Sequence, residues 1–300
     1  MQEESYRNRS AAFSPCFPLA ESWAISPPRR EKIIEAAARP RLEGEVGIGD
    51  VMRPFEMNSF AGKRLLALVR DGDYAHAGEE EAIDRVFGDL PKRSDRWLLD
   101  VGCGRGGTAD YLRKRGWGQV VGIDRDGDSL AYARARYPGV EWVEGDVCAA
   151  PRYLSRKFIQ IYLLNVYYAL EAQRDALLAL RQVAEEGTEL RIFDYLDRGG
   201  FAEDPLEVGG ERIVPHPVVT ERVSRDLATT GWRLLSMEPL SEEYRRWYAA
   251  LARRIEERAP EIVARGGEEA LDYLCTVYRG ILGKIEEGLL GGVLVRAAAA

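Results

Sequence analysis

The sequence has little cysteine and histidine, the residues that most often bind zinc. Among 300 residues there are four cysteines and two histidines. The cysteines do not pair at the spacing of metal ligands, and the histidines are too few to complete a set. We therefore expect neither a zinc site nor a disulfide framework. The cysteines are Cys16, Cys103, Cys148 and Cys275.

Long apolar runs are also lacking. No stretch approaches the length of a membrane-spanning helix, and the first residues, MQEESYRNRSAAF, contain no apolar signal core. We expect a cytoplasmic protein without a membrane partner. A net charge of -7 argues against a nucleic-acid backbone as the main partner, although a local basic patch remains open.

The composition is that of a globular protein, with 46% hydrophobic and 30% charged residues. The length suits one large domain with a cap. Residues 1–78 are predicted to form an N-terminal arm and lid helices, because prolines interrupt the first thirty residues and helical patterns follow. These helical patterns include 31–38 and a helix that Ser59 could cap.

Residues 79–240 are predicted to form a cofactor-binding core, because short apolar runs alternate there with helical patterns. Such alternation is typical of βαβ units and a parallel sheet, whose ligand lies beyond the carboxyl ends of the strands. One predicted helix, 175–187, ends at a glycine before the fifth strand. The first five strands are predicted at 96–101, 119–124, 140–146, 158–164 and 188–196.

The last part of the chain contains two long helical patterns, 242–258 and 268–288. We expect residues 241–288 to form a helical cap inserted before the last strand, and residues 289–300 to form that strand and a tail. The cap aromatics either pack internally or enclose a cation or a flat ring. They are Tyr244, Trp247, Tyr248, Tyr273 and Tyr278.

The stretch LLDVGCGRGGTADYL, residues 98–112, follows the first predicted strand with a glycine-rich turn. Gly102, Gly104 and Gly107 satisfy the pattern G-x-G-x-x-G, which is compatible with a plain turn, a dinucleotide site or an S-adenosylmethionine site. Asp100 discriminates between the last two. Its carboxylate would repel a pyrophosphate but would attract a sulfonium and an amino group.

Two further acids follow the next two strands. Asp124 lies 22 residues after Gly102, where a carboxylate can accept the ribose hydroxyls of either ligand class, or can cap a helix. Asp146 follows the third strand, where it can read an adenine amino group or can serve as a turn residue. Three acids at successive strand ends favour S-adenosylmethionine.

Together, DVGCGRGG, GIDRD and EGDV resemble the class I S-adenosylmethionine-dependent methyltransferases, over roughly residues 79–240 and the final strand. The layout is nearest to small-molecule, amine-type members. The resemblance implies a Rossmann-like α/β fold with a seven-stranded sheet in the order 3-2-1-4-5-7-6, strand 7 being antiparallel. One departure is Gln160, where members often carry an acid.

By the same resemblance, the cofactor would be S-adenosyl-L-methionine and its contacts would follow the strand ends. The methionine part would lie at the glycine turn, the ribose at Asp124 with its neighbour Arg125, and the adenine at Asp146 with Val147. Asn165, Tyr167 and Tyr168 would face the cofactor and the substrate. The contacts implied at the glycine turn are Asp100, Gly102, Cys103 and Gly104.

Methyl transfer depends mostly on positioning, so the candidate catalytic residues are aromatic and polar groups near the strand ends. The segment GDYAHAG carries Tyr74 and His76, which either close over the cofactor or belong to a surface loop. His76 has the better intrinsic pKa for a general base. The other catalytic candidates are Tyr168 and Tyr195, and Asp194 beside Tyr195 is either a substrate contact or a cap.

The leading hypothesis is transfer of a methyl group to a nitrogen or oxygen of a small molecule. A nucleic-acid substrate is disfavoured, because the fourth strand ends in Asn-Val-Tyr-Tyr instead of Asn-Pro-Pro-Tyr. One alternative is a non-catalytic cofactor-binding or partner protein with the same fold. The other is an NAD(P)-dependent oxidoreductase. The acceptor and the oligomeric state stay open, and a homo-oligomer is compatible with the sequence.

Overall fold

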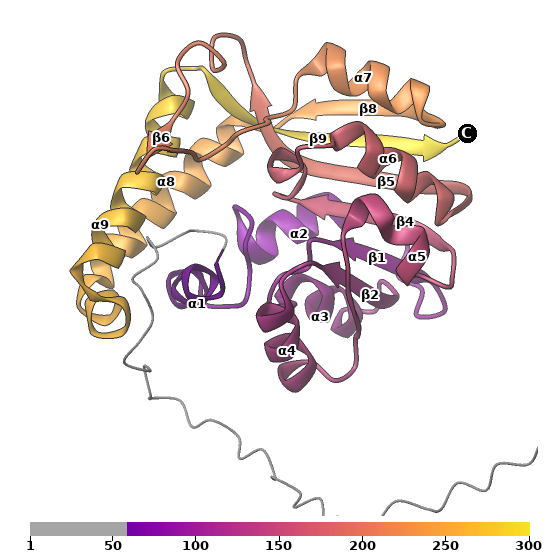
Figure 1. Cartoon of the computed structure of the whole chain (residues 1–300), viewed down its shortest axis with the longest axis horizontal. Coiled ribbons are helices and arrows are strands. Elements are labelled where there is room, and N and C mark those ends of the chain that lie inside the picture. Colours follow the sequence, from indigo (N-terminus) through magenta and orange to yellow (C-terminus); the bar gives the residue numbers. More distant parts are fainter. Residues whose placement is uncertain (1–58) are drawn as a thin grey trace, which may run out of the picture. The chain divides into compact units, whose positions relative to one another are not determined.

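The centre of the fold is an open sheet with the strand order β3-β2-β1-β4-β5-β9-β8 (Figure 1). The structure is a computed structural model and describes residues 59–300. Strands β1 to β5 are parallel, and β9 is antiparallel to both β5 and β8. The predicted order and the antiparallel strand are confirmed. The strands are β1 (Trp97–Val101), β2 (Gln119–Asp124), β3 (Glu141–Glu144), β4 (Phe158–Leu164), β5 (Ala184–Asp197), β8 (Trp232–Pro239) and β9 (Leu290–Ala299), with a separate pair β6 (Glu207–Val208) and β7 (Glu211–Arg212).

Helices cover both faces of the sheet. The helices before and between the strands are α1 (Phe60–Val69), α2 (Glu79–Phe87), α3 (Gly107–Lys114), α4 (Gly127–Arg136), α5 (Ala150–Tyr153), α6 (Gln173–Gln182) and α7 (Thr220–Thr229). The last two helices are α8 (Ser241–Glu257) and α9 (Ala259–Glu286), and two 3-10 turns are η1 (Val147–Ala149) and η2 (Tyr167–Ala169). The predicted arm and the helix at 31–38 lie outside the described residues.

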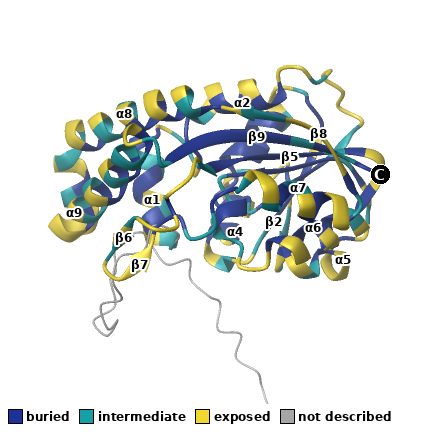
Figure 2. Ribbon diagram, turned by 90° about the horizontal axis from the view of Figure 1, so that it is seen from above, coloured by how far each residue is buried: buried dark blue, intermediate teal, exposed yellow. Residues whose placement is uncertain are grey.

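Alternating side chains divide the interior into two cores. Within β1, Leu98 belongs to the core shared with α1, α2, α3, α8 and α9, and Leu99 belongs to the core shared with α5, α6 and α7. Tyr162 and Ile161 divide in the same way within β4. Successive residues of a strand point to opposite faces, so a sheet covered on both sides needs apolar residues at every position. Figure 2 shows this buried sheet between helices whose outer faces are exposed.

Two helices have different limits from those predicted. Helix α6 ends at Gln182, and β5 begins at Ala184, which pairs with Phe158. Residues 185–187 form an irregularity in that pairing, with Gly187 at φ +76°, so the predicted extension of the helix to 187 is wrong. Helix α9 begins at Ala259, earlier than predicted, and Gly267 interrupts it at φ 81° and ψ 173°. The helical pattern is evident only after that interruption.

Helices α8 and α9 lie between β8 and β9 in the sequence and pack beside α1 (Figure 1). Helix α8 approaches β9 closely, because Gly292 has no side chain. A Cβ atom at Gly292 would lie 2.0 Å from the ring of Tyr244. This contact brings the tyrosines of α8 over the carboxyl ends of β4 and β5, where the predicted ligand site lies.

Candidate active site

The glycine turn after β1 is held against β2 and leaves open space on its other side. The backbone N–H groups of Gly102 and Cys103 donate to the carbonyl of Ile123 at 2.8 and 3.2 Å. A Cβ atom at Gly102 would lie 2.6 Å from Val166, so the turn also packs against the end of β4. At Gly104, with φ +51°, no atom of the described residues lies within 4 Å of the Cβ position. A ligand can therefore approach the backbone at Gly104.

Asp100 is a buried carboxylate at the end of β1, 4% exposed. Among residues 59–300 no hydrogen bond reaches its Oδ2 atom, although Tyr162 lies near enough to favour the charged form. Burial raises the pKa of Asp100 well above its ordinary value, and Asp124 raises it further. A cationic ligand beside Asp100 would satisfy this oxygen and stabilise its charge. The amino group or the sulfonium of S-adenosylmethionine has that character.

Asp124 joins the glycine turn to the loop after β2. Its Oδ2 accepts a hydrogen bond from the N–H of Gly104 at 2.7 Å, and its Oδ1 accepts one from the N–H of Asp126 at 2.9 Å. Each carboxylate oxygen retains a second lone pair, so these bonds leave acceptor capacity for hydroxyl groups. The neighbouring Arg125 is exposed.

Asp146 begins the short turn after β3. Its Oδ1 accepts a hydrogen bond from the N–H of Cys148 at 2.8 Å, and Asp146 itself is exposed. The alternative considered for this residue, a turn residue after the third strand, is therefore present in the structure. The side chain of Val147 is buried, 8% exposed, in the core with α5 and α6. The second oxygen of Asp146 and the backbone at Val147 are the groups that could still contact an adenine.

Residues 59–78 form a segment that covers the glycine turn, which we call the covering segment. Within it, the Oδ1 atom of Asp73 accepts a hydrogen bond from Arg105 Nε at 2.7 Å, and both side chains are 8% exposed. The hydroxyls of Tyr132 and Tyr137 donate to Asp73 Oδ2 at 3.1 and 2.6 Å. The N–H of Gly107 donates to the Asp73 carbonyl at 3.2 Å. The covering segment is thus bonded directly to the turn and to α4.

A second ion pair connects the covering segment to α4. Lys63 Nζ lies 2.8 Å from Asp126 Oδ2, at the N-terminus of α4. The guanidinium of Arg105 also lies 3.6 Å from the ring centroid of Tyr132. Sequence analysis did not identify Lys63, Asp73 or Arg105. The sequence offered two signals for this contact: Arg105 lies inside the glycine turn, and the acidic stretch Asp71-Gly72-Asp73 precedes that turn in the chain.

His76 is buried, 2% exposed, and both of its ring nitrogens have partners. Nδ1 lies 3.2 Å from the carbonyl of Ala77, and Nε2 lies 2.9 Å from Thr108 Oγ1. A carbonyl only accepts, so we assign the proton to Nδ1 and the acceptor role to Nε2. Burial lowers the pKa of His76 to about 4. Tyr74 donates to Glu80 at 3.1 Å on an exposed side of the segment.

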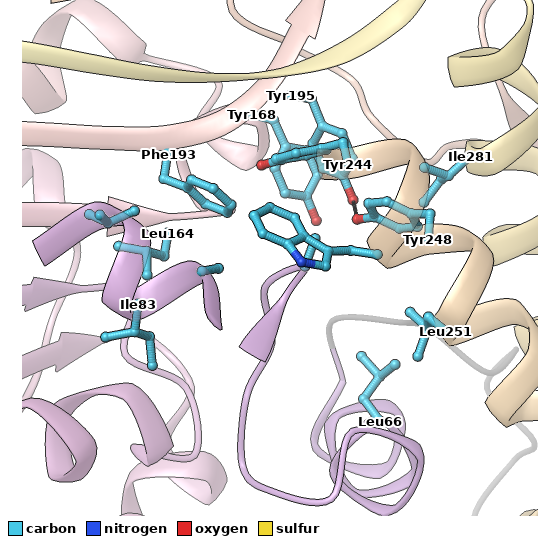
Figure 3. Close-up of a cluster of buried hydrophobic side chains, with 14 of the residues drawn as sticks. Leu66, Ile83, Leu164, Tyr168, Phe193, Tyr195, Tyr244, Tyr248, Leu251 and Ile281 are labelled. Carbon is cyan, nitrogen blue, oxygen red and sulfur yellow. Dashed lines mark hydrogen bonds between the residues drawn. The ribbon is translucent and has the colours of Figure 1, made fainter. Parts of the chain in front are cut away.

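A small cavity of about 30 Å³ lies where α1, α8 and α9 meet the ends of β4 and β5. The structure brings Tyr168 and Tyr195 together there, whereas Tyr74 and His76 do not line the cavity. The hydroxyls of Tyr195 and Tyr248 are hydrogen-bonded to each other (Figure 3). The lining residues are Lys63, Leu66, Arg70, Ala75, Asn165, Tyr168, Tyr195, Tyr248 and Tyr278.

Arg70 is the buried cation of this cavity, 3% exposed. Its NH1 donates to the carbonyl of His76 and to Glu79 Oε1, both at 2.6 Å. Although burial lowers the pKa of Arg70, Glu79 raises it above its ordinary value, so the guanidinium remains charged. Glu79 also accepts from Arg254 at 3.0 Å. Sequence analysis did not identify Arg70, because nothing local distinguishes it from a surface arginine.

The loop after β4 is shaped by Asp194, which is fully buried. Its carboxylate accepts hydrogen bonds from the N–H groups of Val166, Tyr168 and Tyr195 at 3.0, 3.2 and 2.8 Å. Burial raises the pKa of Asp194 to about 7, and hydrogen bonds from the backbone of the surrounding tyrosines oppose that rise. Asp194 therefore caps the loop after β4, which is one of the two roles that the sequence left open for it. Tyr167 packs in the core with α6 and α7, so its expected orientation toward the substrate is wrong.

Asn165 lines the cavity, but both ends of its side chain have partners in the fold. Its Oδ1 accepts from the N–H of Ala77 at 3.0 Å, and its Nδ2 donates to Tyr244 Oη at 3.1 Å. Asn165 also stands next to Val166, which contacts the glycine turn at Gly102. The cavity and the open space at the turn are therefore adjacent parts of one site.

Between Ser59 and Ala300 no group of three or more histidine, cysteine, aspartate or glutamate side chains could hold a metal ion. None of the helices in this range is long and apolar enough to cross a membrane.

Comparison with known proteins identifies the central part of the chain. Residues 98–187 match the family described as "Methyltransferase domain". A similar protein is the trans-aconitate 2-methyltransferase of Afipia carboxidovorans, 34% identical over 64 residues, which are 21% of this chain and 25% of that protein. The chain thus spans about a quarter of the length of the curated relatives that it matches first.

Two solved structures share the fold. One is phosphoethanolamine N-methyltransferase 2 of Haemonchus contortus in complex with phosphomonomethylethanolamine and S-adenosylhomocysteine, with a TM-score of 0.68 and 15% identity, covering 79% of this chain and 56% of that chain. The other is the 4+2 cyclase SpnF, with a TM-score of 0.65 and 19% identity, covering 78% and 92%. The resemblance inferred from the sequence is confirmed: residues 98–187 match a methyltransferase domain, and residues 59–300 have the fold of the class I S-adenosylmethionine-dependent methyltransferases.

Proposed function

We propose that the protein transfers the methyl group of S-adenosylmethionine to a nitrogen or oxygen atom of a small molecule. The observation that carries this proposal is the Oδ2 atom of Asp100, a buried oxygen to which no described residue donates, beside the open space at Gly104. A buried carboxylate without a donor fits a cationic ligand and opposes a pyrophosphate. The methyltransferase domain over residues 98–187 supports the same cofactor.

In this proposal the strand ends hold the cofactor. Asp100 would bind its charged methionine part, together with the backbone of the glycine turn at Gly102, Cys103 and Gly104. Asp124, flanked by Arg125, would accept the ribose hydroxyls with its remaining lone pairs. Asp146 and the backbone of Val147 would contact the adenine. Asn165 would border the methyl group through its position between the turn and the cavity.

When bound, S-adenosylmethionine supplies an electrophilic methyl carbon, to which the acceptor's lone pair forms a bond while the carbon–sulfur bond breaks and its electron pair remains on sulfur. The protein's part is to align the acceptor and to exclude water. Tyr168 and Tyr195 face the cavity and would contact the acceptor. Tyr74 and His76 would act by holding the covering segment in place, because their hydrogen bonds lie within the fold.

Small-molecule acceptors are supported by the names of two similar proteins, a trans-aconitate 2-methyltransferase and a phosphoethanolamine N-methyltransferase. The alternative of a non-methylating protein with this fold is kept, because a cyclase shares the architecture. An oxidoreductase that binds NAD or NADP is opposed by Asp100.

Thermal unfolding of the full chain with four ligands tests the proposal. A ligand at one hundred times its dissociation constant stabilises by about 2.7 kcal/mol, which for a domain of this size raises Tm by about 2–4 °C. We expect this rise with S-adenosylmethionine and S-adenosylhomocysteine, and its loss in Asp100→Ala. Asp128→Ala, on an exposed position of α4, is the matched control. A rise with NAD or NADP alone would refute the proposed cofactor.

Methyl transfer itself is then measured with radiolabelled S-adenosylmethionine and a panel of small amines, amino acids, carboxylic acids and phenols. Label in an acceptor supports catalysis. Cofactor binding without transfer to any class of acceptor would favour the non-methylating alternative.

A further inference from the structure

The cavity contains a buried cation, Arg70, that shares its acidic partner Glu79 with a second arginine. We propose that the cavity binds an acceptor that carries a carboxylate group, and that Arg70 holds this carboxylate. The inference rests on the proposed function and specifies the chemical class of its acceptor. It concerns one end of the acceptor and leaves open which atom is methylated.

The charges around the cavity leave one positive charge without a counterpart. Among residues 59–300, Lys63 and Arg70 are the charged residues in its lining, and no acid of this range lines it. Lys63 is paired with Asp126 at 2.8 Å. Arg70 and Arg254 share the single carboxylate of Glu79, at 2.6 and 3.0 Å. One negative charge on the ligand would complete this set, as a carboxylate does.

Asp194 is the other acid near the cavity, and it does not replace that counterpart. Its carboxylate is directed at three backbone N–H groups, those of Val166, Tyr168 and Tyr195. Its pKa of about 7, raised by burial, also reduces its charge at neutral pH. Arg70 is therefore left to a ligand.

Two residues of the cavity lining also carry hydrogen-bond donors without an acceptor among the described residues. Among residues 59–300 the Nε atom of Arg70 has no hydrogen-bond partner, and the Arg70 side chain is 2% exposed. The hydroxyls of Tyr195 and Tyr248 form one bond with each other, so one of their two protons remains available. Buried donors cost free energy unless they are satisfied. A carboxylate has two oxygens and can accept from both places.

A cationic acceptor fits this cavity poorly. Tyrosine rings can enclose a cation, but here the guanidinium of Arg70 already lies 5.9 Å from the ring centroid of Tyr278. A second cation in the same small space would be repelled by Arg70 and Lys63. The amine-type acceptors that the sequence suggested would therefore need a negative group as well.

A purely structural role for Arg70 is less consistent with its contacts. Glu79 already has Arg254 as a partner at 3.0 Å, so Arg70 is not required to neutralise it. Arg70 contributes one bond to the carbonyl of His76, which a neutral donor could also supply. Burying a full positive charge costs free energy. Because Arg70 lines the cavity, an anionic ligand bound there would offset this cost.

Calorimetric titration of the full chain, saturated with S-adenosylhomocysteine, tests the inference. The probes share a phenyl ring and differ in charge: benzoate, benzamide, benzylamine and phenyl phosphate, with phenylacetate and its amide as a longer pair. We expect each carboxylate to bind about tenfold or more tightly than its amide, the range of one charged hydrogen bond, and benzylamine to bind weakest.

Three variants test which residues cause the preference for a carboxylate. Arg70→Gln should weaken carboxylate binding about tenfold or more while its binding of S-adenosylhomocysteine persists, and Arg70→Lys should retain part of the preference. Tyr248→Phe, which removes one of the two paired hydroxyls, should weaken it a few-fold. Arg253→Gln is the matched control, because Arg253 is 71% exposed on α8.

The outcomes separate this inference from the proposed function. If the wild type does not bind S-adenosylhomocysteine, the proposed function fails first. If it does, and amides or benzylamine bind as tightly as carboxylates, or no carboxylate binds, the inference is refuted. If phenyl phosphate binds more tightly than benzoate, the carboxylate inference is refuted in favour of an acceptor that carries a phosphate. If Arg70→Gln does not fold, Arg70→Lys and Tyr248→Phe decide the question.

Discussion

The side-chain amide of Asn165 donates a hydrogen bond of 3.1 Å to the hydroxyl of Tyr244, 79 residues further along the chain. The same amide accepts from the N–H of Ala77 at 3.0 Å. Asn165 itself has φ 51°, a left-handed conformation that asparagine tolerates better than most residues. One residue at the end of β4 thus joins the sheet, the covering segment and α8 around the cavity.

Tyr244→Phe should destabilise the protein by about 1–3 kcal/mol, because it leaves the amide donor of the half-buried Asn165 without its acceptor. Tyr244 is 0% exposed, so water does not replace the hydroxyl without rearrangement. Urea unfolding measures the free energy. Tyr153→Phe, at a residue 47% exposed, is the control and should change it little. Equal effects of the two substitutions would show that the bond contributes nothing.

Asp73→Ala should destabilise by about 3–5 kcal/mol, because it leaves Arg105 as a buried charge without its partner. Both members of this pair are 8% exposed. The control is Asp95→Ala, which breaks a surface pair with Arg93. The side chains of Arg93 and Asp95 are 54% and 66% exposed, so this substitution should change stability little. Chemical denaturation of both variants gives the comparison. A loss at Asp73 no larger than at Asp95 would mean that Arg105 finds water or another acceptor.

The parts of the fold that the sequence predicts are those determined by neighbouring residues. Short apolar runs between helical patterns were sufficient to place β1 to β5, and the glycine turn with Asp100 marked the ligand end of the sheet. Asp100 and the turn are adjacent in sequence, so their relationship is local. The order of the strands came from the family resemblance, and the observed sheet confirms it.

The contacts that could not be predicted join distant parts of the chain. Asp73 meets Arg105 across 32 residues, and Glu79 meets Arg254 across 175. Charge patterns identify such residues only as charged, since burial decides which partner they require. Tyr167 shows a related difficulty: the 3-10 turn η2 directs neighbouring tyrosines to opposite faces, which a sequence of adjacent aromatics does not indicate.

Asp124→Ala should weaken the binding of S-adenosylhomocysteine strongly while the sheet remains folded. The substitution removes the proposed ribose acceptor and also the acceptor of the Gly104 N–H at 2.7 Å, on which the shape of the turn depends. We expect a loss of at least about 1.5–3 kcal/mol in binding free energy, the range for a hydrogen bond to a charged group. Calorimetry measures it, and Asp128→Ala on exposed α4 surface is the control. Unchanged affinity with an intact fold would remove the ribose assignment.

The buried ring of His76 should make the stability of the protein depend on pH. Its pKa falls from 6.5 in the unfolded chain to about 4 in the fold, because burial disfavours the charged ring. Between these values the unfolded chain binds more protons, so the free energy of unfolding should fall as pH is lowered, by up to about 1.4 kcal/mol per unit. His76→Gln removes this contribution, so the difference between wild type and variant should shrink from pH 7 to pH 4.5 in urea unfolding. A difference that stays constant, or an NMR titration of the His76 ring centred near 6.5, would contradict the buried neutral ring and would restore His76 as a candidate general base.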